Sequence, residues 1–235
     1  MQPVHTQRNK LCDLLDSLND EQWQATTMCE GWDAGDIAAH MLVREREPWY
    51  SVGLVIPQLG DMHTSRMAVR KAAGRAAMIA DLRAGPPRPF AWGIVGRVQV
   101  SEDYIHTEDV RRGGATDAPA GDCQPAFDLT PDDGTGDDRV ANILWEAVSR
   151  FSLQTFGGVK ADGVVALTDG TKTKAYRVGG KIARPARNAS PAETVSISAP
   201  VGDLLLFTTG RRGAHVSIDG PEDLSRAVSH SRRQV

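Results

Sequence analysis

Residues 95–112 read VGRVQVSEDYIHTEDVRR, and this stretch decides the fold of the N-terminal part of the 235-residue chain. Its apolar and acidic residues recur at intervals of three and four, which is the spacing of a helix face packed against other helices. The members of this face are Val95, Val98, Glu102, Ile105 and Asp109. Two carboxylates therefore occupy core positions. Each must be paired or bind a metal, because an isolated charge in an apolar interior is costly.

Glu102 and His106 are four residues apart, so their side chains lie one helical turn apart and can converge on one ion. Such pairs are also common on solvated helices and as ion pairs in a core, and the spacing leaves both interpretations open. A third ligand has to come from another helix. His40 lies three residues after Ile37 on a helix predicted to begin after Trp32. It is either a hydrogen-bonded core histidine or this third ligand.

Two histidines and one glutamate, with positions left open for water or substrate, are a ligand set of catalytic zinc. Structural zinc sites usually close with four protein ligands. The set His40, Glu102 and His106 therefore favours catalysis if a metal binds. Asp109 follows His106 by one turn, which predicts either a carboxylate that supports the histidine ligand or an ion pair with the arginines that come next.

Hydrophobic periodicity divides the chain into a helical part and a strand-rich part. Helices are predicted over residues 4–18, from Asp33 to Pro48, and over 64–83, 92–112 and 138–153. Residues 114–138 are rich in glycine, proline and aspartate, which indicates a loop. From Val164 the period changes toward two, with Asp169-Gly170 as a hairpin turn. The prediction is an α+β chain, with a metal-binding helical bundle over 1–155 and a small α+β domain over 156–235.

Charge and composition exclude several classes of function. The chain carries 27 Lys+Arg and 30 Asp+Glu, a formal charge of −3, so it lacks the basic surface that nucleic-acid binding needs. No apolar run approaches the roughly 20 residues of a membrane span, and we expect a cytoplasmic protein without a membrane partner. Cys12, Cys29 and Cys123 are odd in number and far apart, which indicates reduced thiols and neither a disulfide framework nor a thiolate zinc site.

Two motifs carry a resemblance to a known family. TMCEGWDAGDIAAHM (27–41) and EDYIHTEDVRR (102–112) resemble the mycothiol-dependent maleylpyruvate isomerase group of the DinB-like superfamily. DLLLFTTGRR (203–212), followed by HVSIDGP (215–221), is similar to the small C-terminal α+β domain of that group. The two N-terminal motifs are moderately specific, whereas the middle of the chain and the hairpin match loosely.

The resemblance implies a four-helix bundle that binds a divalent metal, usually zinc, through His40, Glu102 and His106. Nickel and iron are the alternatives. In this group the metal activates the thiol of mycothiol for attack on an electrophilic or unsaturated substrate, and the C-terminal domain supplies an arginine toward the acidic substrate. The resemblance therefore makes Arg211 and Arg212 the candidate catalytic residues.

Three functional hypotheses follow from these patterns. The first is a metal-dependent, mycothiol-using isomerase or thiol S-transferase that acts on a small acid, as a monomer or homodimer. The second is a non-catalytic metal-binding or sensing protein with the same fold. The third is a metal-free helical interaction protein, in which Glu102 and Asp109 pair with arginines such as Arg44 and Arg97.

Overall fold

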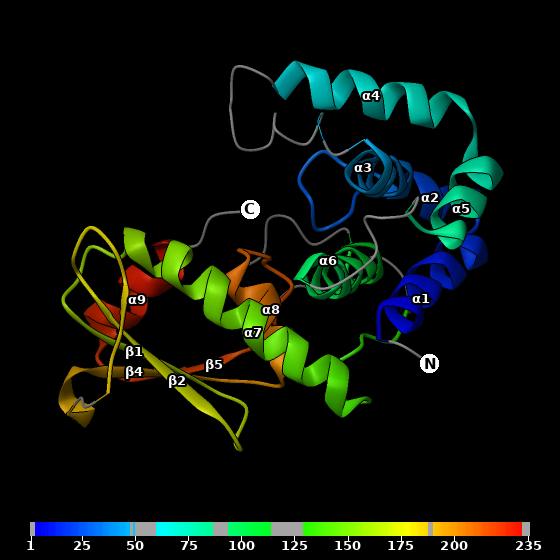
Figure 1. Ribbon diagram of the computed structural model, residues 1–235. Helices are drawn as coiled ribbons and strands as arrows, with labels where there is room; N and C mark the ends of the chain where they lie inside the picture. The colour runs from blue at the N-terminus through cyan, green and yellow to red at the C-terminus, as the bar shows by residue number, and fades with distance from the viewer. Residues whose placement is uncertain are drawn as a thin grey trace. The chain divides into compact units, whose positions relative to one another are not determined.

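The computed structural model describes residues 3–47, 49, 60–86, 94–113, 129–187 and 190–231. Contacts within the chain divide it into two compact units, Met1–Gly114 and Ala115–Val235 (Figure 1). The first unit is helical and the second combines helices with a mixed sheet. The α+β class predicted from the sequence is therefore confirmed.

Helices of the first unit form a closed ring of contacts. Its described residues contain α1 (Pro3–Ser17), α2 (Asp20–Gln24), α3 (Ala34–Arg46), α4 (Gly60–Ala72), α5 (Arg75–Ala84) and α6 (Ile94–Arg111). α1 contacts α5 and α6, while α3 also contacts α5 and α6, and α4 packs on α3. Leu15, Ile37 and Tyr104 are fully buried on three of these helices. The apolar spacing read from the sequence thus marks the faces that the bundle buries.

Gly74 interrupts the alanine-rich stretch 64–83, whose composition predicts continuous helix. Its φ of +88° lies in the left-handed region, which a residue without a side-chain Cβ adopts at little cost. The chain therefore turns between α4 and α5 instead of continuing one rod. The sequence places His63 in a loop before the predicted helix, but α4 begins at Gly60, so His63 lies on a helix.

A five-stranded sheet organises the second unit, with strand order β3-β2-β1-β4-β5. The strands are β1 (Gly163–Thr168), β2 (Thr173–Val178), β3 (Arg184–Pro185), β4 (Thr194–Ser198) and β5 (Ser217–Asp219). β1 and β4 are parallel and the other pairs are antiparallel. The predicted hairpin turn joins β1 to β2, and Asp169 Oδ1 closes it by accepting from the backbone N–H groups of Thr171 at 2.8 Å and Lys172 at 2.7 Å.

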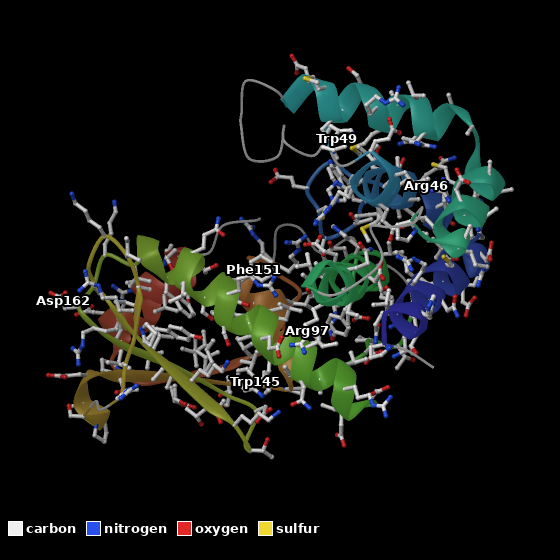
Figure 2. All side chains as sticks on the ribbon, in the orientation of Figure 1. Arg46, Trp49, Arg97, Trp145, Phe151 and Asp162 are labelled. Atoms are coloured by element: carbon white, nitrogen blue, oxygen red, sulfur yellow. The ribbon has the colours of Figure 1, made fainter. Side chains whose placement is uncertain are left out.

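Helix α7 (Asp138–Thr155) belongs to the second unit, so the structure divides the chain earlier than the boundary between 155 and 156 that the sequence predicts. Its apolar face packs on α8 (Val201–Thr208) and contacts β2. Trp145 points from α7 toward the sheet, where its Nε1 donates to Asp169 Oδ2 at 2.7 Å (Figure 2). Helical periodicity gives an apolar face but not its partner, and here the partners are α8 and the sheet.

The remaining elements are α9 (Glu222–Ser231) and two short 3₁₀-helices, Phe156–Gly158 and Pro191–Glu193. Of the predicted loop 114–138, residues 129–137 contain neither helix nor strand, and 114–128 lie outside the described residues. Among the described helices, none combines the length and apolar character that a membrane span requires.

Candidate metal centre

His40 lies two turns into α3, and the start of this helix is fixed by a reciprocal cap. Asp36 N–H donates to Asp33 Oδ1 at 2.7 Å, and Asp33 N–H donates to Asp36 Oδ2 at 3.1 Å. Such a cap satisfies two backbone donors that the first turn leaves unpaired. Lys71 of α4 pairs with both carboxylates, at 3.2 Å and 2.7 Å. The cap fixes where the helix begins and thereby which face carries His40, whose residue surface is 5% exposed.

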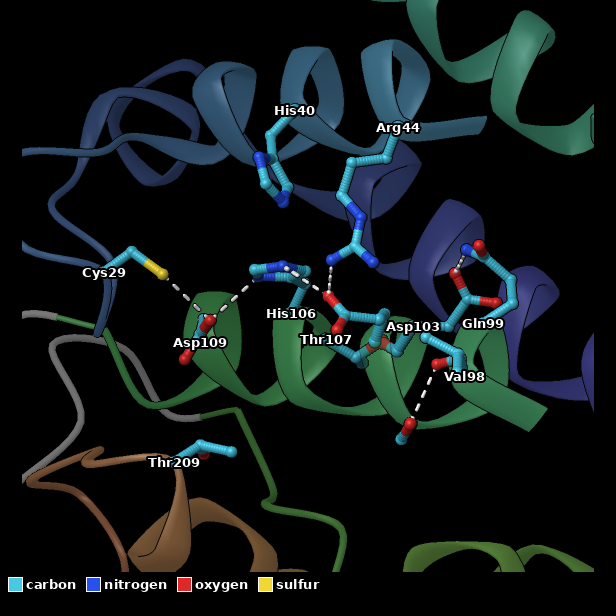
Figure 3. A network of polar contacts seen from close by, with 12 residues as sticks. Cys29, His40, Arg44, Val98, Gln99, Asp103, His106, Thr107, Asp109 and Thr209 are labelled. Atoms are coloured by element: carbon cyan, nitrogen blue, oxygen red, sulfur yellow. Dashed lines mark hydrogen bonds and ion pairs between the residues drawn. The ribbon is translucent and has the colours of Figure 1, made fainter. Parts of the chain in front are cut away.

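The structure brings together the three ligand candidates predicted from the sequence. One ligand atom each from His40, Glu102 and His106 lies within 4.8 Å of the other two. The rings of His40 on α3 and His106 on α6 lie edge to face, with centroids 5.0 Å apart (Figure 3). Both histidines are buried and Glu102 is half-buried. Ligands from two helices thus converge, as the residue spacing on each helix allows.

The separation of Glu102 and His106 suits a shared cation better than a hydrogen bond. Glu102 Oε2 lies 3.6 Å from His106 Nε2, which exceeds the usual hydrogen-bond length of about 2.7–3.2 Å. Two ligands of tetrahedral zinc, with bonds of about 2.0–2.2 Å, lie about 3.4 Å apart. The pair therefore needs little movement to accept an ion.

A third histidine, His63, orients His40. Its Nε2 lies 3.0 Å from His40 Nδ1, and the residue is 3% exposed. A metal-binding histidine usually hydrogen-bonds through its second ring nitrogen, which fixes the tautomer and the ring orientation. Because His63 precedes the predicted helix over 64–83 by one residue, the sequence predicts a surface residue in a loop, and the burial of this side chain on α4 shows that prediction to be wrong. Its spacing of four residues from the buried Met67 is the sequence signal that places both on one helix face.

Asp109 supports His106 and also contacts Cys29. His106 Nδ1 lies 2.9 Å from Asp109 Oδ2, and the Cys29 thiol donates to the same oxygen at 3.1 Å (Figure 3). Asp109 is fully buried. Arg111 and Arg112, the arginines that the sequence offered as partners, each pair with Glu108 at 2.8 Å. The contact with His106 agrees with the prediction that Asp109 supports this histidine.

Electrostatics around His106 favour its protonated form in the metal-free chain. Burial lowers the pKa of His106, but the hydrogen bond to Asp109 and the nearby Cys29 and Glu102 side chains raise it by more, so that the pKa lies well above its usual value. The imidazolium then places a positive charge between two carboxylates. A cation bound at Nε2 has to displace one proton from this ring.

Arg44 of α3 supplies a second positive charge, because its Nη1 forms an ion pair with Glu102 Oε2 (Figure 3). This contact is the pair named in the metal-free hypothesis. The side chains of Arg44 and Glu102 are 27% and 14% exposed, so both retain a path to water. The guanidinium thus shares the oxygen through which Glu102 approaches His106.

On another side of α6, a buried ionic cluster joins α1, α3 and α6. Arg8 Nη2 donates to Glu45 Oε1 at 2.6 Å, and Gln99 Nε2 donates to Asp103 Oδ1 at 2.8 Å. Burial, followed by repulsion from Glu45, raises the pKa of Asp103 to about 8. Residue types alone do not reveal this cluster, because its acidic members look like solvated positions of their helices. It makes Asp103 a neutral group when the surrounding pH is below that pKa.

The N-terminal unit matches a known protein family. Residues 4–111 fit the family model of the mycothiol maleylpyruvate isomerase N-terminal domain. The match spans nearly all of the N-terminal unit, which is therefore similar to this family. The matched range contains His40, Glu102, His106 and Asp109, and the family is the one that the two N-terminal motifs resemble.

Solved structures extend the likeness in fold to the second unit. Two crystal structures match, one of the mycothiol-dependent maleylpyruvate isomerase and one of a histidine-to-alanine mutant of it. Each has 14% sequence identity and a TM-score of 0.52, and covers 92% of this chain and 90% of the other. No curated protein sequence matches the chain. The likeness therefore concerns the fold.

The two arginines implied by the resemblance follow α8 in the second unit. Gly210, with a φ of +81°, ends the helical segment. Arg211 is 2% exposed and its Nη1 donates to the carbonyl oxygen of Thr209 at 3.0 Å, whereas Arg212 is exposed. The adjacent residues thus present different chemistry, one guanidinium enclosed by protein and one in contact with solvent.

Proposed function

We propose that this protein is a metal-dependent enzyme that uses a low-molecular-weight thiol, with mycothiol as the expected cofactor, in an isomerase or thiol S-transferase reaction. His40, Glu102 and His106 are the proposed metal ligands, with zinc expected first and nickel or iron as alternatives. The substrate class is a small electrophilic or unsaturated acid. The family match and the convergence of the three side chains support this proposal.

A single distance carries the metal assignment, the 3.6 Å between Glu102 Oε2 and His106 Nε2. It is too long for a hydrogen bond and close to the ligand spacing of a tetrahedral cation. The donor set fits as well, because two imidazoles and one carboxylate leave at least one coordination position for a thiol or substrate. A cation bound there would lower the pKa of a coordinated thiol and make it a nucleophilic thiolate.

The residues around the ligands prepare the site for this chemistry. Asp109 accepts from His106 Nδ1, which directs the lone pair of Nε2 toward the shared centre. His63 performs the same role for His40 through a 3.0 Å contact at Nδ1. Arg44 holds the Glu102 carboxylate until a cation replaces it. These contacts thus orient each ligand before an ion arrives.

Arg211 and Arg212 are the proposed partners of the substrate carboxylate, since guanidinium groups bind carboxylates through paired hydrogen bonds. Separate Arg211→Gln and Arg212→Gln variants distinguish them. Replacement of the arginine that binds the substrate should raise KM strongly and leave the metal content unchanged. If neither variant raises KM, these arginines do not bind the substrate.

The decisive experiment measures bound metal and thiol chemistry on the same preparations. His106→Ala should lose bound metal, whereas His215→Ala, an exposed histidine of the second unit, is the matched control and should retain it. Thiol addition to an unsaturated acid such as maleate or a maleyl ketoacid should depend on metal and stop with a chelator. Unchanged metal stoichiometry in His106→Ala would refute the ligand assignment.

A second candidate function is a metal-binding or sensing protein without turnover. The ion pair between Arg44 and Glu102 favours it, because this pair satisfies Glu102 in the absence of metal and gives the chain two defined states. Such a protein binds metal but shows no thiol consumption with or without chelator. The same assays therefore separate the two candidates.

A further inference from the structure

Cys29 is held against the end of α6 by the loop that precedes α3. Met28 N–H donates to the Asp109 carbonyl oxygen at 2.9 Å, which ties this loop to the helix. Cys29 N–H donates to Thr27 Oγ1 at 3.2 Å, and the Cys29 carbonyl oxygen accepts from Trp32 N–H at 3.0 Å. The backbone therefore fixes where the thiol points, and it is half-buried beside Asp109.

Cys29, Asp109 and His106 form a second set of converging ligands. Asp109 Oδ2 lies 3.1 Å from Cys29 Sγ and 2.9 Å from His106 Nδ1, and one ligand atom of each residue lies within 4.8 Å of the others. The edges of a tetrahedral zinc site with these donor types are about 3.4–3.6 Å. Asp109 Oδ2 therefore has to move about half an ångström away from each of the other two atoms for a cation to fit, which side-chain rotation can supply.

We propose that Cys29, Asp109 and His106 Nδ1 form a second cation site, for a thiophilic divalent cation such as Cd²⁺ or Zn²⁺. A thiolate is the donor that such cations prefer. The two negative ligands neutralise the dication inside the protein, which is the condition for burying it at low cost. Arg111 and Arg112, the nearest basic residues in the sequence, are paired with Glu108 in the described part of the chain.

The second site and the proposed catalytic centre exclude each other because both use the ring of His106. A neutral imidazole has one nitrogen lone pair, and its other nitrogen carries a proton. With a cation at Nε2, the Nδ1 proton stays in the hydrogen bond to Asp109. With a cation at Nδ1, that proton and the thiol proton of Cys29 leave to solvent, and Nε2–H faces Glu102. A thiophilic cation would therefore inhibit the metal centre that lies on the other side of this ring.

Titration of the metal-free full-length chain with Cd²⁺ tests the inference without a catalytic assay. Thiolate ligation produces an ultraviolet charge-transfer absorption, which should grow until one Cd²⁺ is bound per chain and then stop. Cys29→Ser should abolish this absorption. His40→Ala should retain it, because His40 belongs only to the first ligand set. Loss of the absorption in His40→Ala, or its persistence in Cys29→Ser, would overturn the second site.

Two cysteine variants serve as matched controls. Burial raises the pKa of the Cys12 thiol to about 12, so Cys12→Ser should leave the absorption unchanged, and so should Cys123→Ser. Cadmium-113 NMR of the wild-type chain gives an answer that needs no variant, since sulfur ligation shifts the resonance downfield. A resonance typical of nitrogen and oxygen ligands alone would refute thiolate binding, and saturation at two Cd²⁺ per chain would refute mutual exclusion. These outcomes concern Cys29, so they are distinct from failure of the proposed enzyme function.

Discussion

Replacing Asp103 by asparagine should stabilise the chain at neutral pH and have little effect in acid. Asp103 is 1% exposed, and its pKa is about 8 in the folded chain against a usual value of 3.8. Between these values the folded chain keeps a proton on Asp103 that the unfolded chain has lost. The free energy of unfolding therefore falls as pH rises from about 4 to about 8, by up to about 1.4 kcal/mol per pH unit.

Asparagine resembles the protonated carboxyl group and does not titrate, so the variant escapes this loss. Its Oδ1 can still accept from Gln99 Nε2, which donates to Asp103 Oδ1 at 2.8 Å in the wild-type chain. Between pH 5 and pH 7 the stability of Asp103→Asn relative to wild type should rise by about 2–3 kcal/mol. Above about pH 8 the difference should become constant, because Asp103 is then ionised in both states.

Urea unfolding at half-unit pH steps measures this difference. Tryptophan fluorescence is a suitable signal, because four of the five tryptophans lie within residues 1–114. Asp20→Asn, at an exposed position on α2, is the control and should follow the wild-type pH profile. A stability difference between Asp103→Asn and wild type that stays constant from pH 5 to pH 7 would refute the assignment of a neutral buried carboxyl group.

Three further predictions concern other parts of the structure. Arg44→Gln should tighten Zn²⁺ binding about tenfold, because it removes the cation that competes for Glu102; a chelator-competition titration that gives an unchanged Kd would contradict this. Leu144→Ala, at a fully buried position on α7, should lower the free energy of unfolding by about 2–5 kcal/mol, and a loss below 1 kcal/mol in urea unfolding would be inconsistent with that burial. Asp33→Ala removes the side-chain cap of α3 and should cost about 1 kcal/mol, which calorimetry would detect as a lower Tm, whereas an unchanged Tm would show that the cap adds no stability.

Much of the candidate centre could be predicted from spacing on single helices. The interval of four between Glu102 and His106 puts both side chains on one face, and the cap at Asp33 sets the start of the helix that carries His40. These relations depend only on the 3.6-residue period and on backbone donors at a helix end. His63 was missed because its relation to His40 crosses from one helix to another, and sequence spacing contains no distance of that kind.

The partners of Asp109 could not be predicted from sequence spacing either. His106 precedes Asp109 by three residues and Arg112 follows it by three, so on a helix Asp109 can contact either side chain. In the structure Arg112 forms an ion pair with Glu108, and the thiol of Cys29, eighty positions away in the sequence, donates a hydrogen bond to Asp109. Only the fold of the loop before α3 could decide this, because it places the thiol.

The sequence by itself determined the helical and strand-rich parts, the family likeness of the N-terminal unit and the faces on which the ligand candidates lie, because each follows from residues close together along the chain. Tertiary structure decided that α7 packs with the sheet unit, that His40 meets His106, and that Cys29 reaches Asp109. The physical reason is that an apolar face or a polar side chain can be satisfied by several partners. The partner is selected when distant segments pack together and all their buried groups must be satisfied at once.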